Sequence, residues 1–238
     1  MIPLVYDQIN HWGRDDEFFI ALLKELNVEY IADLGCGTGR WTTHLAENGY
    51  KITAIDPNKE AIDMARSKDN PGNVNWIEGD SANLQSNTYD AVIMTANVAQ
   101  VFLTDDSWKR TISDVFRSLK VGGHFIFDTR NPLAKVWKEW EKDNTPDLAK
   151  DRLSGDSLEI YTEYEGFEGE IYTFYEIVKN TKKDKILFRE KMQLRFRDQT
   201  ELKASLKSTG FTQIETYGDW EFKQANSKNK SFIFHCVK

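Results

Sequence analysis

The chain has 238 residues, of which 40% are hydrophobic and 29% charged, as is typical of a soluble globular protein with one or two domains. No apolar run is long enough to span a bilayer and the N-terminus lacks a basic-then-apolar signal pattern, so we expect a cytoplasmic protein with no membrane partner. The formal charge is −7, and the acidic excess lies in the first 130 residues, which argues against a nucleic-acid partner. Cys36 and Cys236 belong to no CxxC motif or Cys/His cluster, so we predict neither a disulfide nor a metal site.

The first element that the pattern predicts is an amphipathic helix over residues 15–26. Its apolar residues, among them Phe18 and Leu22, recur at helical spacing, and its acidic first turn suits the positive end of a helix dipole. Tyr6 and Trp12 precede this helix and do not fit its apolar face. We expect these two aromatic side chains to fold over a cleft.

Residues 31–56 predict the beginning of a βαβ unit. A short apolar run enters a turn with three glycines, a helix follows, and a second apolar run stops at Asp56. Glycines Gly35, Gly37 and Gly39 let the backbone approach a ligand at the helix N-terminus. An acid at the tip of the second strand can accept hydrogen bonds from a ribose diol. The stretch therefore predicts a ligand that contains a nucleoside.

The chain then alternates between helix and strand. The predicted elements lie at 57–66, 73–77, 89–94, 104–119 and 124–127. Such alternation predicts a doubly wound parallel sheet, in which ligands bind beyond the carboxyl ends of the strands. Thr95 and Asn97 follow the fourth strand, and Arg130 and Asn131 follow the fifth. We expect these four residues to lie near the ligand.

Residues 131–197 depart from this pattern. A short helix is expected at 131–143. Three runs with period-two alternation follow, at 157–165, 170–179 and 185–196. They predict an antiparallel insertion of three strands, from which Tyr172 is a candidate to line a pocket. We expect this insertion to form either a lid over the carboxyl edge of the main sheet or a contact in a homodimer.

The α/β pattern resumes at residue 198 with a helix, followed by strands at 211–217 and 231–237 that are separated by a polar loop. These two strands can pair as a hairpin at one edge of the main sheet. We therefore predict that 1–130 and 198–238 form one α/β domain. Its sheet is Rossmann-like, doubly wound, mostly parallel and seven-stranded, with an antiparallel terminal hairpin.

Two classes of ligand compete for the glycine loop. A dinucleotide loop reads GxGxxG/A, but here the third glycine comes one position early and Arg40 occupies the sixth place. The run Asp33-Leu34-Gly35-Cys36-Gly37-Thr38-Gly39 instead resembles the first motif of class I S-adenosylmethionine-dependent methyltransferases.

Later segments resemble the remaining motifs of that family in the same order. Asp56 and Pro57 resemble its ribose-binding acid and the residue that packs near the adenine, and Gly79-Asp80-Ser81-Ala82 resembles its adenine-binding motif. Residues 119–123 resemble the turn before strand five. The resemblance covers roughly residues 28–130 and 198–238, and does not extend with comparable specificity to the insertion.

The resemblance implies S-adenosyl-L-methionine as the cofactor and a methyl transfer to an oxygen or nitrogen atom of a small molecule. It implies the following cofactor-binding residues: Tyr6, Trp12, Asp33, Gly35, Cys36, Gly37, Asp56, Pro57, Asp80, Ser81, Ala82, Thr95 and Asn97. Arg130, Asn131 and Tyr172 are the candidates for substrate contacts, and no catalytic base is assigned. In-line methyl transfer depends mostly on positioning the nucleophile, and a base is needed only when the nucleophile must first lose a proton.

Two other functions remain open. A NAD(P)-dependent oxidoreductase is disfavoured by Arg40 and by the lack of a second dinucleotide-binding half. A binding module that has kept the S-adenosylmethionine site but lost its chemistry is compatible with the same loop residues.

Overall fold

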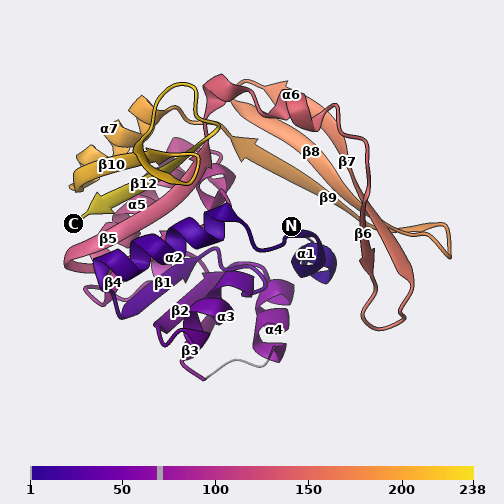
Figure 1. Cartoon of the computed structure of the whole chain (residues 1–238), viewed down its shortest axis with the longest axis horizontal. Helices are drawn as coiled ribbons and strands as arrows, with labels where there is room; N and C mark the ends of the chain where they lie inside the picture. The colour runs from indigo at the N-terminus through magenta and orange to yellow at the C-terminus, as the bar shows by residue number, and fades with distance from the viewer. Residues whose placement is uncertain (1, 69–71) are drawn as a thin grey trace.

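The computed structural model describes residues 2–68 and 72–238, which form a large sheet, a smaller second sheet and helices around them (Figure 1). The strands of the large sheet are β1 (Tyr30–Leu34), β2 (Lys51–Asp56), β3 (Val74–Glu78), β4 (Tyr89–Met94), β5 (Leu119–Arg130), β10 (Thr212–Gly218), β11 (Glu221–Gln224) and β12 (Ser231–Val237). Their spatial order is β11-β10-β12-β5-β4-β1-β2-β3. Strands β1 to β5 are parallel, whereas β12, β10 and β11 pair antiparallel at one side. The predicted Rossmann-like doubly wound sheet is confirmed.

The large sheet has eight strands, not the seven expected. The additional strand is β11, which lies within the stretch between 217 and 231 that the pattern predicted to be a polar loop. Phe222 of β11 stacks on Phe18 with ring centroids 4.5 Å apart. Because this contact joins residues at opposite ends of the chain, local sequence did not reveal it.

The helices pack either on the faces of the large sheet or against the second sheet. They are α1 (Pro3–Ile9), α2 (Arg14–Leu26), α3 (Arg40–Glu47), α4 (Lys59–Ser67), α5 (Asp105–Ser118), α6 (Trp137–Trp140) and α7 (Gln199–Thr209), with single 3-10 turns η1 (Ser81–Asn83), η2 (Val98–Val101) and η3 (Pro132–Ala134). Apolar residues of α2 and α3 pack in one core with the strands, and those of α5 and α7 pack in another. The helix predicted at 15–26 is therefore present as α2, with its apolar stripe buried.

The second sheet consists of β6 (Asp147–Lys150), β7 (Ser157–Glu168), β8 (Ile171–Asn180) and β9 (Lys185–Arg195), antiparallel and in that order. The prediction of three strands missed β6, a four-residue strand that pairs with the beginning of β7. The helix expected at 131–143 is divided into η3 and the one-turn α6, because Lys135 adopts a left-handed backbone conformation with φ of 52° between them.

Helix α1 lies between the large sheet and the second sheet, close to α4 on one side and to β6 on the other (Figure 1). Ile2 and Val5 are buried against Leu158, Ile160 and Val178 of the second sheet. The sequence pattern predicted no helix or strand at these residues. Helix α1 therefore fills the space between the two sheets and contacts both α4 and β6.

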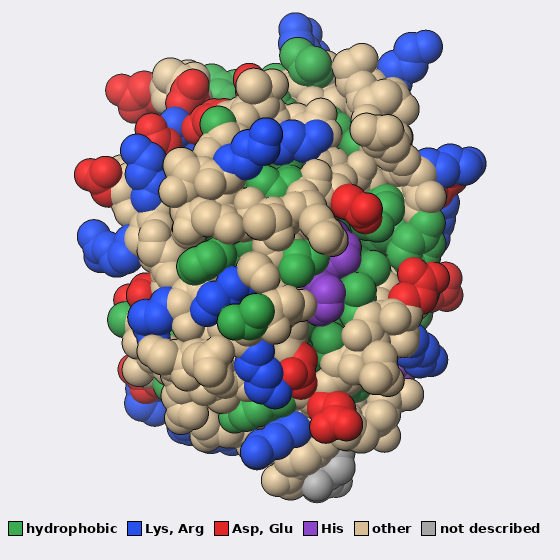
Figure 2. Space-filling model, turned by 90° about the vertical axis from the view of Figure 1, so that its left-hand side faces the viewer, with side chains coloured by type: hydrophobic (Ala, Val, Ile, Leu, Met, Phe, Trp, Pro, Cys, Tyr) green, Lys and Arg blue, Asp and Glu red, His purple; other side chains and the backbone are tan. Residues whose placement is uncertain are grey.

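The surface beside β10 and β12 carries basic, acidic and apolar side chains interspersed, with two neighbouring histidines (Figure 2). His124 of β5 and His235 of β12 have ring nitrogens 3.0 Å apart. Among the helices in the described part of the chain, none is both long and apolar enough to cross a bilayer.

Candidate active site

Most of the predicted cofactor-binding residues lie at the carboxyl edge of the parallel strands. Along the chain, β2 and β3 extend the sheet from one side of β1, whereas β4 and β5 extend it from the other. The order therefore reverses between β1 and β4, and such a reversal opens a crevice where open α/β sheets bind ligands. The glycine loop leaves β1 at this crevice, and Thr95 and Asn97 leave β4 there.

The glycine loop is held in a shape that side chains would disturb. Gly35 has φ of 84°, and a Cβ atom added there would lie 2.6 Å from a methyl group of Val98. Gly39 has φ of 73°, and its Cβ atom would lie 2.4 Å from the Trp76 ring. Both positions therefore require glycine for conformation and for space. The loop consequently brings its backbone close to the crevice.

Asp56 ends β2 and connects the glycine loop to the next helix. Its Oδ2 accepts a hydrogen bond from the Gly37 amide at 2.9 Å, and its Oδ1 accepts one from the Asn58 amide at 2.8 Å. Burial raises the pKa of this carboxyl group. Each carboxylate oxygen has a second lone-pair direction, so the fixed carboxylate can still accept hydrogen bonds from two ribose hydroxyls.

Asp33 in β1 is a buried acid, and only one of its two carboxylate oxygens has a hydrogen-bond partner among the described residues. Its side chain is 1% exposed, and the Thr42 hydroxyl donates to Oδ2 at 2.5 Å. Within the described residues, Oδ1 is buried and has no hydrogen-bond partner. Burial raises the pKa of Asp33 to about 7. A buried polar atom without a partner is costly, so the site fits a ligand that supplies a donor or a positive charge.

The predicted adenine-binding residues form the η1 turn. Asp80 is exposed and caps this turn by accepting a hydrogen bond from the Ala82 amide at 2.9 Å. The Ser81 hydroxyl is turned away from the crevice, since it donates to Asp114 of α5 at 2.8 Å. Only the backbone of Ser81 therefore remains for a ligand. Pro57 is exposed beside Asp56, as is Ala82.

Asp128 was not among the predicted site residues. It lies in β5 at the carboxyl edge, is 1% exposed, and accepts hydrogen bonds from the Asn97 amide at 3.1 and 3.0 Å. Burial raises its pKa to about 7. The Oδ1 atom of Asn97 is itself buried, with no partner among the described residues. A sequence signal existed, because Asp128 ends the apolar run of β5 as Asp56 ends that of β2.

Comparison with known proteins identifies this arrangement. Residues 31–123 match a family described as a methyltransferase domain. A cypemycin N-terminal methyltransferase from a Streptomyces species is 31% identical over 115 residues, 48% of this chain and 47% of that protein. A glycine/sarcosine N-methyltransferase from Aphanothece halophytica is 24% identical over 246 residues, 98% of this chain and 86% of that protein. A solved S-adenosylmethionine-dependent methyltransferase from Clostridium acetobutylicum has a TM-score of 0.77 at 20% identity, covering 98% of this chain and 96% of that one.

Residues 31–123 thus carry a methyltransferase domain, and the fold of the chain is that of solved S-adenosylmethionine-dependent methyltransferases. The chain spans about half the length of the first of these relatives. The family resemblance that the motifs predicted is thus confirmed, and S-adenosylmethionine is the cofactor. The residues fit it, because Asp33 offers a buried oxygen to its ammonium group and Asp56 offers a fixed carboxylate to its ribose.

The aromatic residues that precede α2 take different places in this methyltransferase. Tyr6 is a partly buried residue of α1, and burial raises the pKa of its hydroxyl group. Trp12 is 44% exposed and packs on His44 of α3, with ring centroids 4.3 Å apart. Cys36 is a free thiol within the loop, and burial raises its pKa.

The three predicted substrate residues all make contacts within the chain. Arg130 Nη1 donates to Gln100 Oε1 at 2.9 Å and its guanidinium lies 4.9 Å from the Trp140 ring centroid. Asn131 is 1% exposed and donates to two carbonyl groups of the loop before β12. Tyr172 is 0% exposed and donates to Glu141. Both side chains are thus buried and hydrogen-bonded within the chain in this structure, and their contacts with substrate stay predictions.

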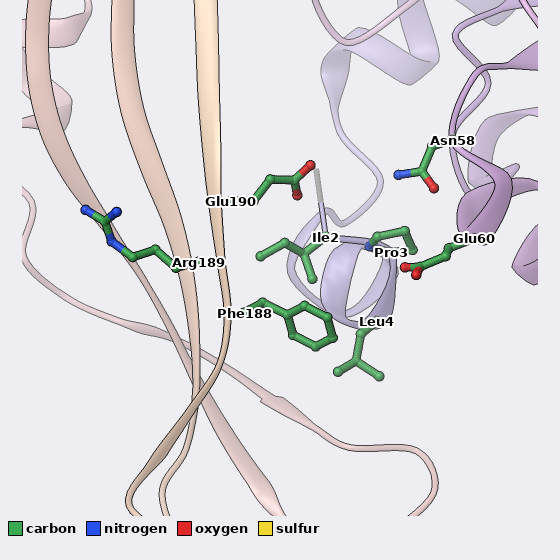
Figure 3. A pocket seen from close by; sticks show the side chains of 8 residues that line it. All are labelled: Ile2, Pro3, Leu4, Asn58, Glu60, Phe188, Arg189 and Glu190. Carbon is green, nitrogen blue, oxygen red and sulfur yellow. The ribbon is translucent and has the colours of Figure 1, made fainter.

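Two pockets flank α1 of the methyltransferase. One, of about 270 Å3, is lined by Ile2, Pro3, Leu4, Asn58, Glu60, Phe188, Arg189 and Glu190. Phe188 and Glu190 point from β9 toward α1, whereas Arg189 points to the other side of the strand (Figure 3). The other, of about 240 Å3, is lined by Ile2, Val5, Tyr6, Ile9, Asn10, Asp147, Ile160 and Glu176. The first adjoins Asn58 next to the ribose-binding acid, and the second lies between α1 and strands β6 to β8.

Proposed function

We propose that this methyltransferase transfers the methyl group of S-adenosylmethionine to a nitrogen atom of a small-molecule amine. The observation that carries the proposal is the pocket of about 240 Å3 between α1 and the second sheet. Pockets for drug-sized ligands usually measure about 300–1,000 Å3. A cavity at or below the lower end of this range suits a small metabolite better than a peptide or a nucleic acid.

The lining of this pocket favours an amine over an anionic acceptor. It contains the carboxyl group of Asp147 and the hydroxyl group of Tyr6, and none of its lining residues is Lys or Arg. The Glu176 carboxyl group also lines the pocket but already has a partner within the chain. Acidic groups attract a positively charged or hydrogen-bond-donating acceptor and repel an anion. The relative that is matched over nearly the whole of this chain is itself named as an N-methyltransferase, which supports the same choice.

The chain's own residues would divide the work between binding and proton handling. Asp33, Asp56 and the glycine loop hold the cofactor, which supplies an electrophilic methyl carbon when bound. Asp128 is placed at the carboxyl edge with a pKa raised to about 7, so its carboxyl group can take up a proton near neutral pH. A protonated amine becomes a nucleophile once it gives up one proton, which a carboxylate can accept. An alcohol is a weaker nucleophile and needs a stronger base to remove its hydroxyl proton.

The experiment is a methyl-transfer assay with radiolabelled S-adenosylmethionine and matched acceptors. Small amines are compared with isosteric alcohols, and the Asp56→Ala variant serves as the inactive control. We expect label in the amines and little or none in the alcohols. Label confined to the alcohols would refute N-methylation in favour of the O-methylation that the motifs also allow.

Binding measurements separate the remaining alternatives. We expect S-adenosylhomocysteine to bind the chain and NADH not to bind. Binding of NADH alone would overturn the cofactor assignment. Binding of S-adenosylhomocysteine without any methyl transfer across broad metabolite extracts would favour a non-catalytic module.

A further inference from the structure

Asp7 of α1 connects three separate segments of the molecule. The Thr38 hydroxyl of the glycine loop donates to Asp7 Oδ1 at 2.5 Å, and Lys68 Nζ, just beyond α4, lies 2.6 Å from Oδ2. Arg152, between β6 and β7, places a guanidinium nitrogen 3.6 Å from the same oxygen. The Asp7 side chain is only 15% exposed. This carboxylate therefore has partners in both the cofactor-binding domain and the second sheet.

The Asp7 contacts act directly on the glycine loop. Thr38 is fully buried between Gly37 and Gly39, and Lys68 Nζ also donates to its carbonyl oxygen at 2.6 Å. The hydroxyl and the carbonyl of one loop residue are thus held by Asp7 and by a lysine that Asp7 contacts. A charge-assisted hydrogen bond of this kind is stronger than a neutral one. The loop conformation consequently depends on the position of α1.

Gln8, the next residue, binds α1 to the second sheet. Its Nε2 donates to the Lys150 carbonyl at 2.9 Å, and its Oε1 accepts from the Lys150 amide at 2.9 Å. Gln8 thereby pairs with the edge of β6 as another strand would. The burial of Ile2 and Val5 against the second sheet adds an apolar attachment. Two consecutive residues of α1 are therefore tied to the two halves of the molecule.

We infer that Asp7 and Gln8 form a clasp through which α1 couples cofactor binding at the glycine loop to the order of β6 in the second sheet. Asp7 is a positioning residue, since it acts through Thr38 and not by touching the reacting atoms. Binding of the cofactor stabilises the loop conformation that Asp7 holds, which keeps α1 and its partner strand β6 in place. Coupling between two sites is reciprocal. Weakening the attachment of α1 to β6 therefore weakens cofactor binding by the same factor by which the bound cofactor strengthens that attachment. The inference depends on cofactor binding and is independent of which acceptor is used.

The test measures S-adenosylhomocysteine binding and amide hydrogen exchange in the full chain. In the wild type, S-adenosylhomocysteine should slow exchange of the Lys150 amide, whose acceptor is Gln8. Asp7→Asn removes the negative charge but keeps the shape, and should weaken binding by about 5- to 150-fold, the usual range of such couplings. It should also abolish the response at Lys150. Asp63→Asn is the matched control, since Asp63 is 51% exposed and its ion pairs, to Lys59 and Arg66, stay within α4.

Gln8→Ala provides a second, milder variant that separates coupling from folding. It should lose the response of the Lys150 amide to S-adenosylhomocysteine while retaining exchange protection within the glycine loop. A purely structural role would lower the melting temperature and leave that response intact, which would overturn the inference. Wild-type affinity and wild-type Lys150 protection in Asp7→Asn would overturn it as well. If the wild type itself fails to bind S-adenosylhomocysteine, the cofactor assignment fails instead.

Discussion

Replacing Asp33 by asparagine should make the protein more stable and a weaker cofactor binder. The carboxyl group of Asp33 is 1% exposed, and burial raises its pKa from 3.8 to about 7. The folded state therefore binds a proton more tightly than the unfolded state between these two values. Stability consequently falls as pH rises from about 4 to about 7, and the whole penalty is present above pH 7.

The size of this loss of stability follows from the shift in the pKa of Asp33. About three pKa units correspond to roughly 4 kcal/mol at pH 8, as an order of magnitude, because one unit is worth about 1.4 kcal/mol. At pH 5 the carboxyl group is protonated in the folded state, so the penalty shrinks to roughly 2 kcal/mol. The asparagine side chain would be neutral at both pH values, and its oxygen could still accept the hydrogen bond that the Thr42 hydroxyl donates to Asp33.

Urea unfolding of Asp33→Asn and wild type at pH 8 and pH 5 checks this expectation. The variant should gain free energy of unfolding at pH 8 and gain clearly less at pH 5. Calorimetry should show S-adenosylhomocysteine binding weakened by about 10- to 100-fold, as expected for the loss of a hydrogen bond to a charged group. A variant that is less stable at pH 8, or that binds with wild-type affinity, would refute the reasoning. Asp90→Asn is the control, for which we expect a lower free energy of unfolding. Asp90 forms an ion pair with Lys120, and the substitution removes the charge that stabilises this pair.

Three further outcomes follow from the same site. Asp56→Ala should weaken S-adenosylhomocysteine binding by roughly 1–3 kcal/mol through lost charge-assisted hydrogen bonds, and unchanged affinity in calorimetry would remove Asp56 from the ribose site. Gly39→Ala should lower the melting temperature more than Gly49→Ala does. Both glycines have positive φ, but only the Cβ atom added at position 39 would collide with Trp76, so equal decreases in melting temperature would contradict this. Asp128→Asn should abolish the limb of the pH–rate profile near pH 7, where its carboxyl group changes charge, and a profile identical to that of the wild type would exclude it from proton transfer.

The cofactor half of the site could be predicted because its information is local. The glycine positions, the acid at the end of β2 and the η1 turn are contiguous motifs that follow successive strands of the parallel sheet. Positive φ at Gly35 and Gly39, and the position of Asp56 at the end of its strand, follow from short segments that adopt the same shape in any sheet of this kind. Thus the sequence alone predicted the fold class, the resemblance to these methyltransferases and the cofactor.

The acceptor half was decided by contacts between residues far apart in the chain. Tyr172 has a sequence environment that suits a pocket wall, yet Glu141 and the surrounding aromatic side chains enclose it completely. Asn131 directly follows Arg130, the last residue of β5, but the loop before β12 takes up its amide group. Helix α1 became visible only through its burial against the second sheet. Burial is a property of the assembled chain, so periodicity could propose which residues face a cleft but only the tertiary structure could decide which of them remain open to a substrate.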